Sequence, residues 1–463
     1  MRGIAFMDNN AFEENPSSHS RRKKRTKFQI FKEVYLLPLV IFAVLLLIFG
    51  IVLNQCTRQK ETTPTETTLG VDVMNRFELQ AEATAVMRDA IMHADDYDYD
   101  GALSALYGFS GNLQDFPEIA ELIDTYTQAK NNLVVWTGRD VPNLSFHVLI
   151  EDLDTALKDS TYGQKGNNLY NRNFITTTEF SAILQQLYDN GYLLVSLSDL
   201  YDYAYDSATG RMVYTEKELR LPFGRKPLLL TETHCTYYHY MEGAGFASKL
   251  KYDGRFYNEK TTSNGSTVTG NFDLVPILED FISHNPDFSY RNARAILAFS
   301  GYNGIFGYQI QSDNLTGVAL KQEQQEAKAL CDALQEAGYT LACYSYRNLD
   351  YQLLDAEDIR EDLEKWDREI ASVIGTTNVM VFARESDIGT DYGNNTKFNV
   401  LYDAGYRFFL GSSAFLYHQV SDQYVRHNRL MVTGSTLAHY PERFEGMLNP
   451  ETILDSRRGD IPK

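Results

Sequence analysis

The feature that most constrains the fold is a regular alternation of short apolar runs and amphipathic segments between residues 132 and 433. The apolar runs have the length and composition of strands, and the segments between them space their apolar residues as one face of a helix does. The expected strands are 133–136, 145–150, 193–197, 228–234, 295–300, 340–344, 378–383, 406–410 and 429–433. The expected helices are 177–190, 274–284, 318–337, 355–373 and 396–404. Strand–helix alternation is typical of a parallel sheet, and so many strands favour a barrel over a doubly wound layer. We therefore predict an α/β fold built as a (β/α) barrel.

The expected strand at residues 228–234 ends in ionisable and aromatic side chains. Functional groups of parallel-strand proteins gather at the carboxyl ends of the strands, which makes this stretch a candidate site. Side chains alternate along a strand, so Glu232 and His234 are expected on one face and Thr233 on the other. The alternative is a strand that simply surfaces into a polar loop.

A second constraint lies near the N-terminus. Residues 34–53 contain no charged side chain, and a helix of that length crosses a hydrocarbon core of about 30 Å. Six basic side chains between residues 21 and 27 precede it, and basic flanks stay on the cytoplasmic side. A cleaved signal peptide is the alternative, but its apolar region is usually shorter and followed by small residues that are missing here. We predict a cell-membrane protein with a cytoplasmic tail at residues 1–33, one transmembrane helix at 34–54 and the rest of the chain outside.

Charge supports the same division. Residues 1–60 carry ten basic and four acidic side chains, whereas the rest of the chain carries 33 and 58, a net charge of −25. Such an acidic segment repels nucleic acid, so no nucleic-acid partner is expected. The chain has only four cysteines, too few for a disulfide framework.

The segments outside the membrane differ in composition. Residues 55–70 are rich in threonine and predict an extended linker. Residues 71–131 have helical periodicity and predict a small helical stalk or adaptor, followed by the main domain at 132–463. Residues 247–272 predict a β-hairpin insertion near the top of the barrel.

Several short blocks carry a family resemblance. They are Phe146-His147, the aromatic block 237–243, the glycine-rich block 301–308 and Ser386-Asp387. Over residues 140–435 the chain resembles the polysaccharide deacetylases of the NodB-homology family, in particular a membrane-anchored branch from Gram-positive bacteria. The resemblance implies a deformed (β/α) barrel whose top face holds a metal-dependent site acting on acetylated sugars. It also implies a role in cell-wall carbohydrate metabolism, with cell-wall polysaccharide or peptidoglycan as the partner.

The chain departs from the family pattern at the residues that perform the chemistry. The family's catalytic base position holds Thr233, and its three metal-ligand positions hold His234, Tyr344 and Asn348. A hydroxyl group does not take up a proton near neutral pH, and neither a phenol nor an amide replaces an imidazole. A catalytic zinc ion usually takes three ligands from the protein. The resemblance therefore implies a degenerate site with no bound cofactor.

Three functions remain open. In the first, the degenerate site binds glycan without turnover, and aromatic faces hold the sugar; the candidate side chains are Tyr237, Tyr238, Tyr302 and Tyr346. With 31 tyrosines in the chain, ordinary packing is the alternative for any one of them. In the second, a divalent metal such as zinc is held by a rebuilt set of ligands, and the protein is an active carbohydrate deacetylase or esterase; the candidates beside His234 are His147, Glu232, His239, Glu385 and Asp387. In the third, the protein is a structural adaptor that recruits a wall-synthesis partner.

Overall fold

A ten-stranded curled sheet forms the centre of the structure, a computed structural model that describes residues 66–138, 140–163, 168–311 and 315–463. Its strand order is β15-β16-β14-β13-β12-β11-β7-β2-β17, with β3 paired to the start of β7. Within this sheet, β15 and β16 form the antiparallel pair and the other pairs are parallel. The strands are β2 (Asn143–Phe146), β3 (Tyr192–Leu194), β7 (Lys226–Thr233), β11 (Ile296–Phe299), β12 (Thr340–Cys343), β13 (Val379–Val381), β14 (Phe408–Leu410), β15 (His418–Val420), β16 (Val425–His427) and β17 (Leu430–Met431). The predicted α/β class is confirmed, and the sheet is a curled half-barrel between the edge strands β15 and β17.

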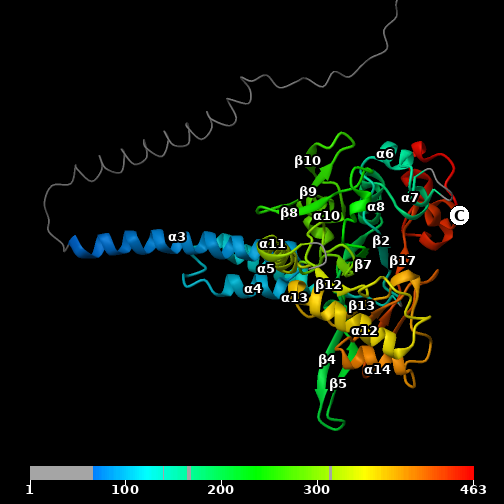
Figure 1. The fold of residues 1–463 in the computed structure, drawn as a ribbon. Coiled ribbons are helices and arrows are strands. Elements are labelled where there is room, and N and C mark those ends of the chain that lie inside the picture. The colour runs from blue at the N-terminus through cyan, green and yellow to red at the C-terminus, as the bar shows by residue number, and fades with distance from the viewer. Residues whose placement is uncertain (1–65, 139, 164–167, 312–314) are drawn as a thin grey trace, which may run out of the picture. The chain divides into compact units, whose positions relative to one another are not determined.

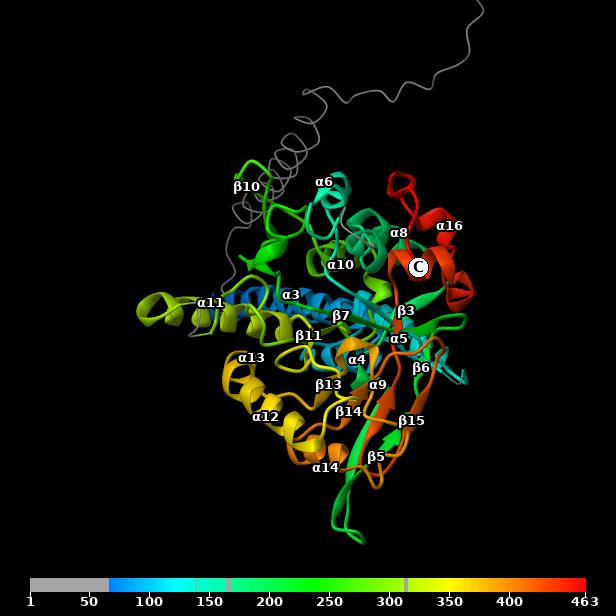
Figure 2. The same ribbon diagram turned by 45° about the vertical axis from the view of Figure 1, so that its right-hand side comes forward.

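Helices cover the outer side of this sheet, as Figure 2 shows for α10, α12 and α14. They are α8 (Thr177–Asp189), α10 (Leu274–His284), α11 (Gly317–Glu336), α12 (Ala356–Trp366), α13 (Ser372–Ile374) and α14 (Thr396–Asp403). In α8 the buried side chains recur at the spacing of one helical face, and Thr176 with Glu179 closes a capping box at its start. A π-helical turn at Asp367–Ala371 joins α12 to α13, so the predicted helix 355–373 is one interrupted segment.

The two faces of the sheet bury different cores. Leu228 and Leu230 of β7 pack in the outer core, whereas Leu229 packs in the inner one, as alternation along a strand requires. The inner core is completed by α9 (Leu197–Leu200), by the hairpin of β4 (Tyr201–Asp206) and β5 (Arg211–Glu216), and by β6 (Arg220–Leu221). The partner of β6, β1 (Val134–Val135), is exposed. The hairpin was not predicted, because Tyr and Asp alternate along β4 without a clear apolar run.

The predicted insertion is a three-stranded antiparallel sheet. Its strands are β8 (Lys249–Tyr252), β9 (Phe256–Thr261) and β10 (Thr267–Gly270), in the order β10-β9-β8. The tight turn between β8 and β9 contains Gly254, whose φ of +101° favours glycine. Figure 1 shows these strands beside α10. The side-chain amide of Asn258 on β9 donates to the hydroxyl of Tyr237 at 3.0 Å, which fixes the insertion against the loop that follows β7.

The expected helical region is present as α3 (Glu66–Asp95), α4 (Tyr99–Tyr107) and α5 (Pro117–Asn131), and α3 begins before the predicted start at residue 71. These helices share a small core of their own. Residues 77–463 group as one compact unit, which includes α4, α5 and the curled sheet. In the described ranges, no helix has both the length and the apolar character needed to cross a membrane. The predicted span at residues 34–54 lies outside the described residues, so the anchor stays a prediction.

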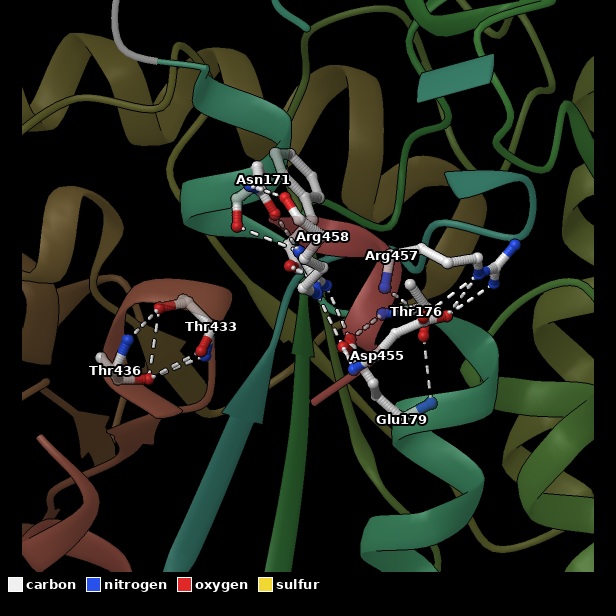
Figure 3. A network of polar contacts seen from close by, with 9 residues as sticks. Asn171, Thr176, Glu179, Thr433, Thr436, Asp455, Arg457 and Arg458 are labelled. Atoms are coloured by element: carbon white, nitrogen blue, oxygen red, sulfur yellow. Dashed lines mark hydrogen bonds and ion pairs between the residues drawn. The ribbon is translucent and has the colours of Figure 1, made fainter. Parts of the chain in front are cut away.

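The C-terminal segment is fixed to the start of α8 by a buried ion pair. After α15 (Gly434–His439) and α16 (Pro450–Ile453), the chain places Arg458 against Glu179, with Nε to Oε1 and Nη2 to Oε2 each at 2.6 Å (Figure 3). Both side chains are almost completely buried. Arg458 Nη1 also donates to the side-chain oxygen of Asn171 at 2.8 Å. This bidentate pair satisfies both charges with hydrogen bonds, the condition under which a buried ion pair is tolerated.

Candidate ligand-binding site at the carboxyl ends of the strands

A cavity of about 690 Å³ lies at the carboxyl ends of β2, β7 and β12. This volume is within the range of pockets that hold small ligands. Its wall is made mainly of aromatic, imidazole, amide and guanidinium groups. The lining residues are His147, Val148, Tyr162, Leu169, Tyr170, Asn173, Phe174, His234, Tyr238, Tyr240, Met241, Tyr302, Tyr344, Arg347, Asn348 and Arg384.

The turn that follows β7 corrects the expectation for Glu232 and His234. Strand β7 ends at Thr233, and His234 has a φ of +60°, so the alternation of side chains stops there. The ring of His234 lines the cavity, whereas the carboxyl of Glu232 is buried beside Asp273 at the start of α10 and is not part of the wall. Burial and the neighbouring carboxylate raise the pKa of Glu232 well above its usual range. Glu232 is therefore separated from the candidate site.

Two neighbouring imidazoles line the cavity. The hydroxyl of Thr233 donates to the carbonyl of Phe146 at 3.1 Å, so its oxygen accepts from His147 Nδ1 at 2.7 Å. His234 Nδ1 pairs with the hydroxyl of Tyr238 at 2.7 Å, and the rings of His147 and His234 are 5.0 Å apart between centroids. Burial lowers the pKa of His147 to about 4 and lowers that of His234 well below its usual range. Both rings are neutral at pH 7, and each has one nitrogen engaged with a protein hydroxyl.

The four residues singled out by the resemblance lie at this end of the sheet. The ring of Tyr344, just after β12, lies 5.0 Å from that of His234 between centroids, and Asn348 lines the same cavity. The side-chain oxygen of Asn348 is buried and has no hydrogen-bond partner among the described residues. The structure thus places His234, Tyr344 and Asn348 in one cavity wall, with Thr233 behind it on His147.

A wall of stacked aromatic rings leads away from the two imidazoles. The rings of Tyr238 and Tyr240 lie 5.2 Å apart with planes 15° apart, and Tyr162 and Tyr302 pack against them at 5.2 and 5.8 Å. Of the four tyrosines proposed from the sequence, Tyr238 and Tyr302 line the cavity. The other two do not: Tyr237 is buried with its hydroxyl bound by Asn258, and the buried Tyr346 donates to Glu369.

The sequence alone did not identify some of the aromatic residues of the cavity wall. Tyr162, Tyr170 and Phe174 belong to the segment between α6 (Leu153–Lys158) and α8, which contains no recognisable motif. Only the fold brings this segment against the loop that follows β7.

The ligands proposed for a rebuilt metal site are dispersed, apart from His147. His239 is half-exposed and contacts the amide of Gln309, while Asp387 accepts from Arg426 at 2.8 Å and from the hydroxyl of Tyr392 at 2.6 Å. The side chain of Glu385 lies outside the described residues. Among the side chains that the structure describes, no three of the His, Cys, Asp and Glu type gather as metal ligands. His234, Tyr344 and Asn348 offer one imidazole, a phenol and an amide, a set that does not fit zinc.

Three of the eleven described non-glycine residues with positive φ line the cavity. His234, Ser345, Asn348 and Arg384 have φ values of +60°, +58°, +53° and +59°, and the first and the last two of them line the wall. A non-glycine residue in this conformation costs about 1–3 kcal/mol and persists only where the surroundings impose it. Such residues cluster at functional sites, so the strain marks this end of the sheet as the candidate site.

Comparison with known proteins adds one structural similarity. No protein-family model and no curated protein matches the chain. Among solved structures, the Streptococcus pyogenes deacetylase PplD in complex with acetate is similar at 11% sequence identity and a TM-score of 0.34, over 69% of this chain and 100% of that one.

Proposed function

We propose that the protein is a membrane-anchored, extracellular deacetylase-like protein whose cavity binds a cell-wall saccharide without metal-dependent deacetylation. The observation that carries the proposal is the aromatic wall at the carboxyl ends of the strands, beside hydrogen-bonding groups that are uncharged at pH 7. Sugars present apolar C–H faces and a rim of hydroxyls. Stacked tyrosine rings match the faces, and neutral imidazole and amide groups match the hydroxyls.

The chemistry of the site agrees with binding rather than hydrolysis. Hydrolysis of an acetamide needs a base poised to take a proton from water and a group that stabilises the oxyanion. The hydroxyl at position 233 donates to a backbone carbonyl, and the carboxyl of Glu232 is buried away from the cavity. The hydroxyl of Thr233 and Nδ1 of His234 are therefore engaged with neighbouring groups of the protein.

The test measures saccharide binding by the full-length chain in detergent, with chitin oligomers and peptidoglycan fragments as ligands. Tyr240 lines the cavity with 49% of its surface exposed, and Tyr252 on the insertion has 50% exposed but is not part of the wall. Tyr240→Ala should weaken binding about 3- to 10-fold, the usual loss for one aromatic contact. Tyr252→Ala is the matched control and should leave affinity unchanged.

Two results would contradict the proposal. If neither ligand binds, or if the two variants behave alike, the cavity is not the saccharide site, and the adaptor function gains support. If the protein releases acetate from these ligands and His234→Ala abolishes both that activity and bound zinc, the protein is an active deacetylase with a rebuilt site.

A further inference from the structure

We propose that the saccharide bound in this cavity is anionic, carrying a carboxylate or phosphate group that Arg384 and Arg347 recognise. This inference rests on the proposed function and narrows the class of ligand. Neutral N-acetylated sugars would satisfy the aromatic wall alone, so the two guanidinium groups need a separate explanation.

The formal charges at the cavity wall are of one sign. Arg347 and Arg384 line the wall, and none of the described side chains that line it is acidic. The two imidazoles add no positive charge at pH 7, because burial holds both in the neutral form. A ligand in the cavity therefore meets two guanidinium groups and neutral dipoles, an environment that favours a negative group.

Arg384 supplies the uncompensated charge. Its Nε donates to the backbone carbonyl of Asn348 at 3.1 Å, and it forms no ion pair with a described residue. It lies close enough to His234 for its charge to lower the pKa of that imidazole, after burial and His147. Arg384 and Asn348 both have positive φ, and the hydrogen bond from Arg384 Nε to the Asn348 carbonyl ties the exposed guanidinium to the cavity wall.

Arg347 supplies an oriented set of donors. Its Nε donates at 3.0 Å to Asp362, a fully buried carboxylate that also accepts from the backbone N–H of Tyr346 at 2.7 Å and from the hydroxyl of Tyr351 at 2.9 Å. The side chain is nevertheless 54% exposed, and its Nη atoms form no hydrogen bond with a described residue. Asp362 thus fixes the plane of the guanidinium, and the Nη groups remain for a ligand oxygen.

The negative charge of the chain after residue 60 acts against this preference for anions, but solvent ions screen it. The part of the chain after residue 60 has a net charge of −25, which repels anions at long range. At an ionic strength of 0.15 M the screening length is about 8 Å, so distant carboxylates contribute little compared with two guanidinium groups in the wall. We expect the affinity for an anionic saccharide to fall with added salt while the affinity for a neutral one stays constant.

The experiment compares matched ligands on the full-length chain in detergent. The probes are the disaccharide of N-acetylglucosamine and N-acetylmuramic acid, the methyl ester of its carboxylate, N-acetylglucosamine 1-phosphate and the neutral, N-acetylated form of chitobiose. Arg384→Gln should weaken binding of the charged ligands about 10- to 100-fold, as for the loss of a charge-assisted hydrogen bond, and change binding of the ester and chitobiose less than about twofold. Arg347→Gln should act in the same direction but less strongly, because Asp362 already balances its charge.

Arg211→Gln, on the exposed strand β5 away from the cavity, is the control and should change nothing. Stronger binding of the carboxylate or of the phosphate supports the inference and identifies which of the two the site takes. If the acid and its methyl ester bind equally well and Arg384→Gln has no effect, the anionic preference is wrong while saccharide binding stands. If none of the four probes binds, the proposed function fails as well.

Discussion

The buried pair of Glu232 and Asp273 gives the stability of the protein a defined pH dependence. Burial and the neighbouring carboxylate raise the pKa of Glu232 from its ordinary value of 4.5, so the folded protein keeps a proton that the unfolded chain releases above pH 4.5. Below that pH both states are protonated and the effect vanishes. Above it the free energy of unfolding falls as pH rises, by about 1.4 kcal/mol per pH unit for one retained proton.

The Glu232→Gln variant has a similar shape and no proton to lose, so it should become more stable than the native protein as pH increases. The difference in unfolding free energy should grow with pH above 4.5, by about 1.4 kcal/mol per pH unit for as long as the folded protein keeps the proton. The compact unit spans residues 77–463, and an unfolding entropy of about 2.1 cal/mol/K per residue converts each such step into a difference in Tm of roughly 2 °C.

Thermal unfolding followed by tryptophan fluorescence at pH 5, 6 and 7 measures the effect, since Trp366 is buried in the core. Glu259→Gln on β9 replaces a partly exposed carboxylate on the neighbouring insertion and serves as the control. A Tm difference between Glu232→Gln and the native protein that stays constant with pH would refute the reasoning.

Two further predictions concern the C-terminal segment and the topology. Glu179→Gln leaves Arg458 buried without its carboxylate, which should cost about 3–5 kcal/mol and lower Tm by roughly 4–6 °C, whereas Glu121→Gln on the exposed face of α5 should change Tm by less than 1 °C. Equal Tm values for these two variants would show that the pair does not fix the segment. Residues 61–463 should be digested by protease added outside intact cells, because the basic cluster precedes the predicted span; protection of this region, or a released chain that begins near residue 57, would overturn the anchor.

The elements that could be predicted from the sequence are those with strong local patterns. The helix expected at 274–284 is present with those bounds, because its apolar positions fall on one face. Most strands of the sheet were visible as apolar runs, but β15 and β16 were not expected, and the strand expected at 133–136 pairs with β6 outside this sheet. The hairpin β4–β5 was missed, since its tyrosines and aspartates give neither a helical nor a clear strand pattern.

The candidate site was predictable only in part. From the resemblance of their motifs we expected Thr233, His234, Tyr344 and Asn348 at one end of the sheet. The resemblance did not indicate that the carboxyl of Glu232 is buried away from the cavity. Positive φ is uncommon for any residue other than glycine, and the apolar run itself gave no sign that alternation would end at Thr233. The contributions of Tyr162 and Phe174 depend on tertiary packing between segments that are distant in the chain, which no local pattern reports.

The ion pair of Arg458 with Glu179 has a consequence for the order in which the protein is assembled. Arg458 and Asn171 are 287 positions apart in the sequence. Strand β2 likewise pairs with β17, which is synthesised much later. At a synthesis rate of about 5–20 residues per second, this separation corresponds to a delay on the order of 15–60 s. During that interval the edge of β2 and the acidic start of α8 have no partner, which leaves the nascent chain open to chaperones and to aggregation. We therefore expect the domain to finish folding only after β17 and Arg458 have been synthesised. This last step should be slow, because it depends on contacts between residues that are distant in the sequence.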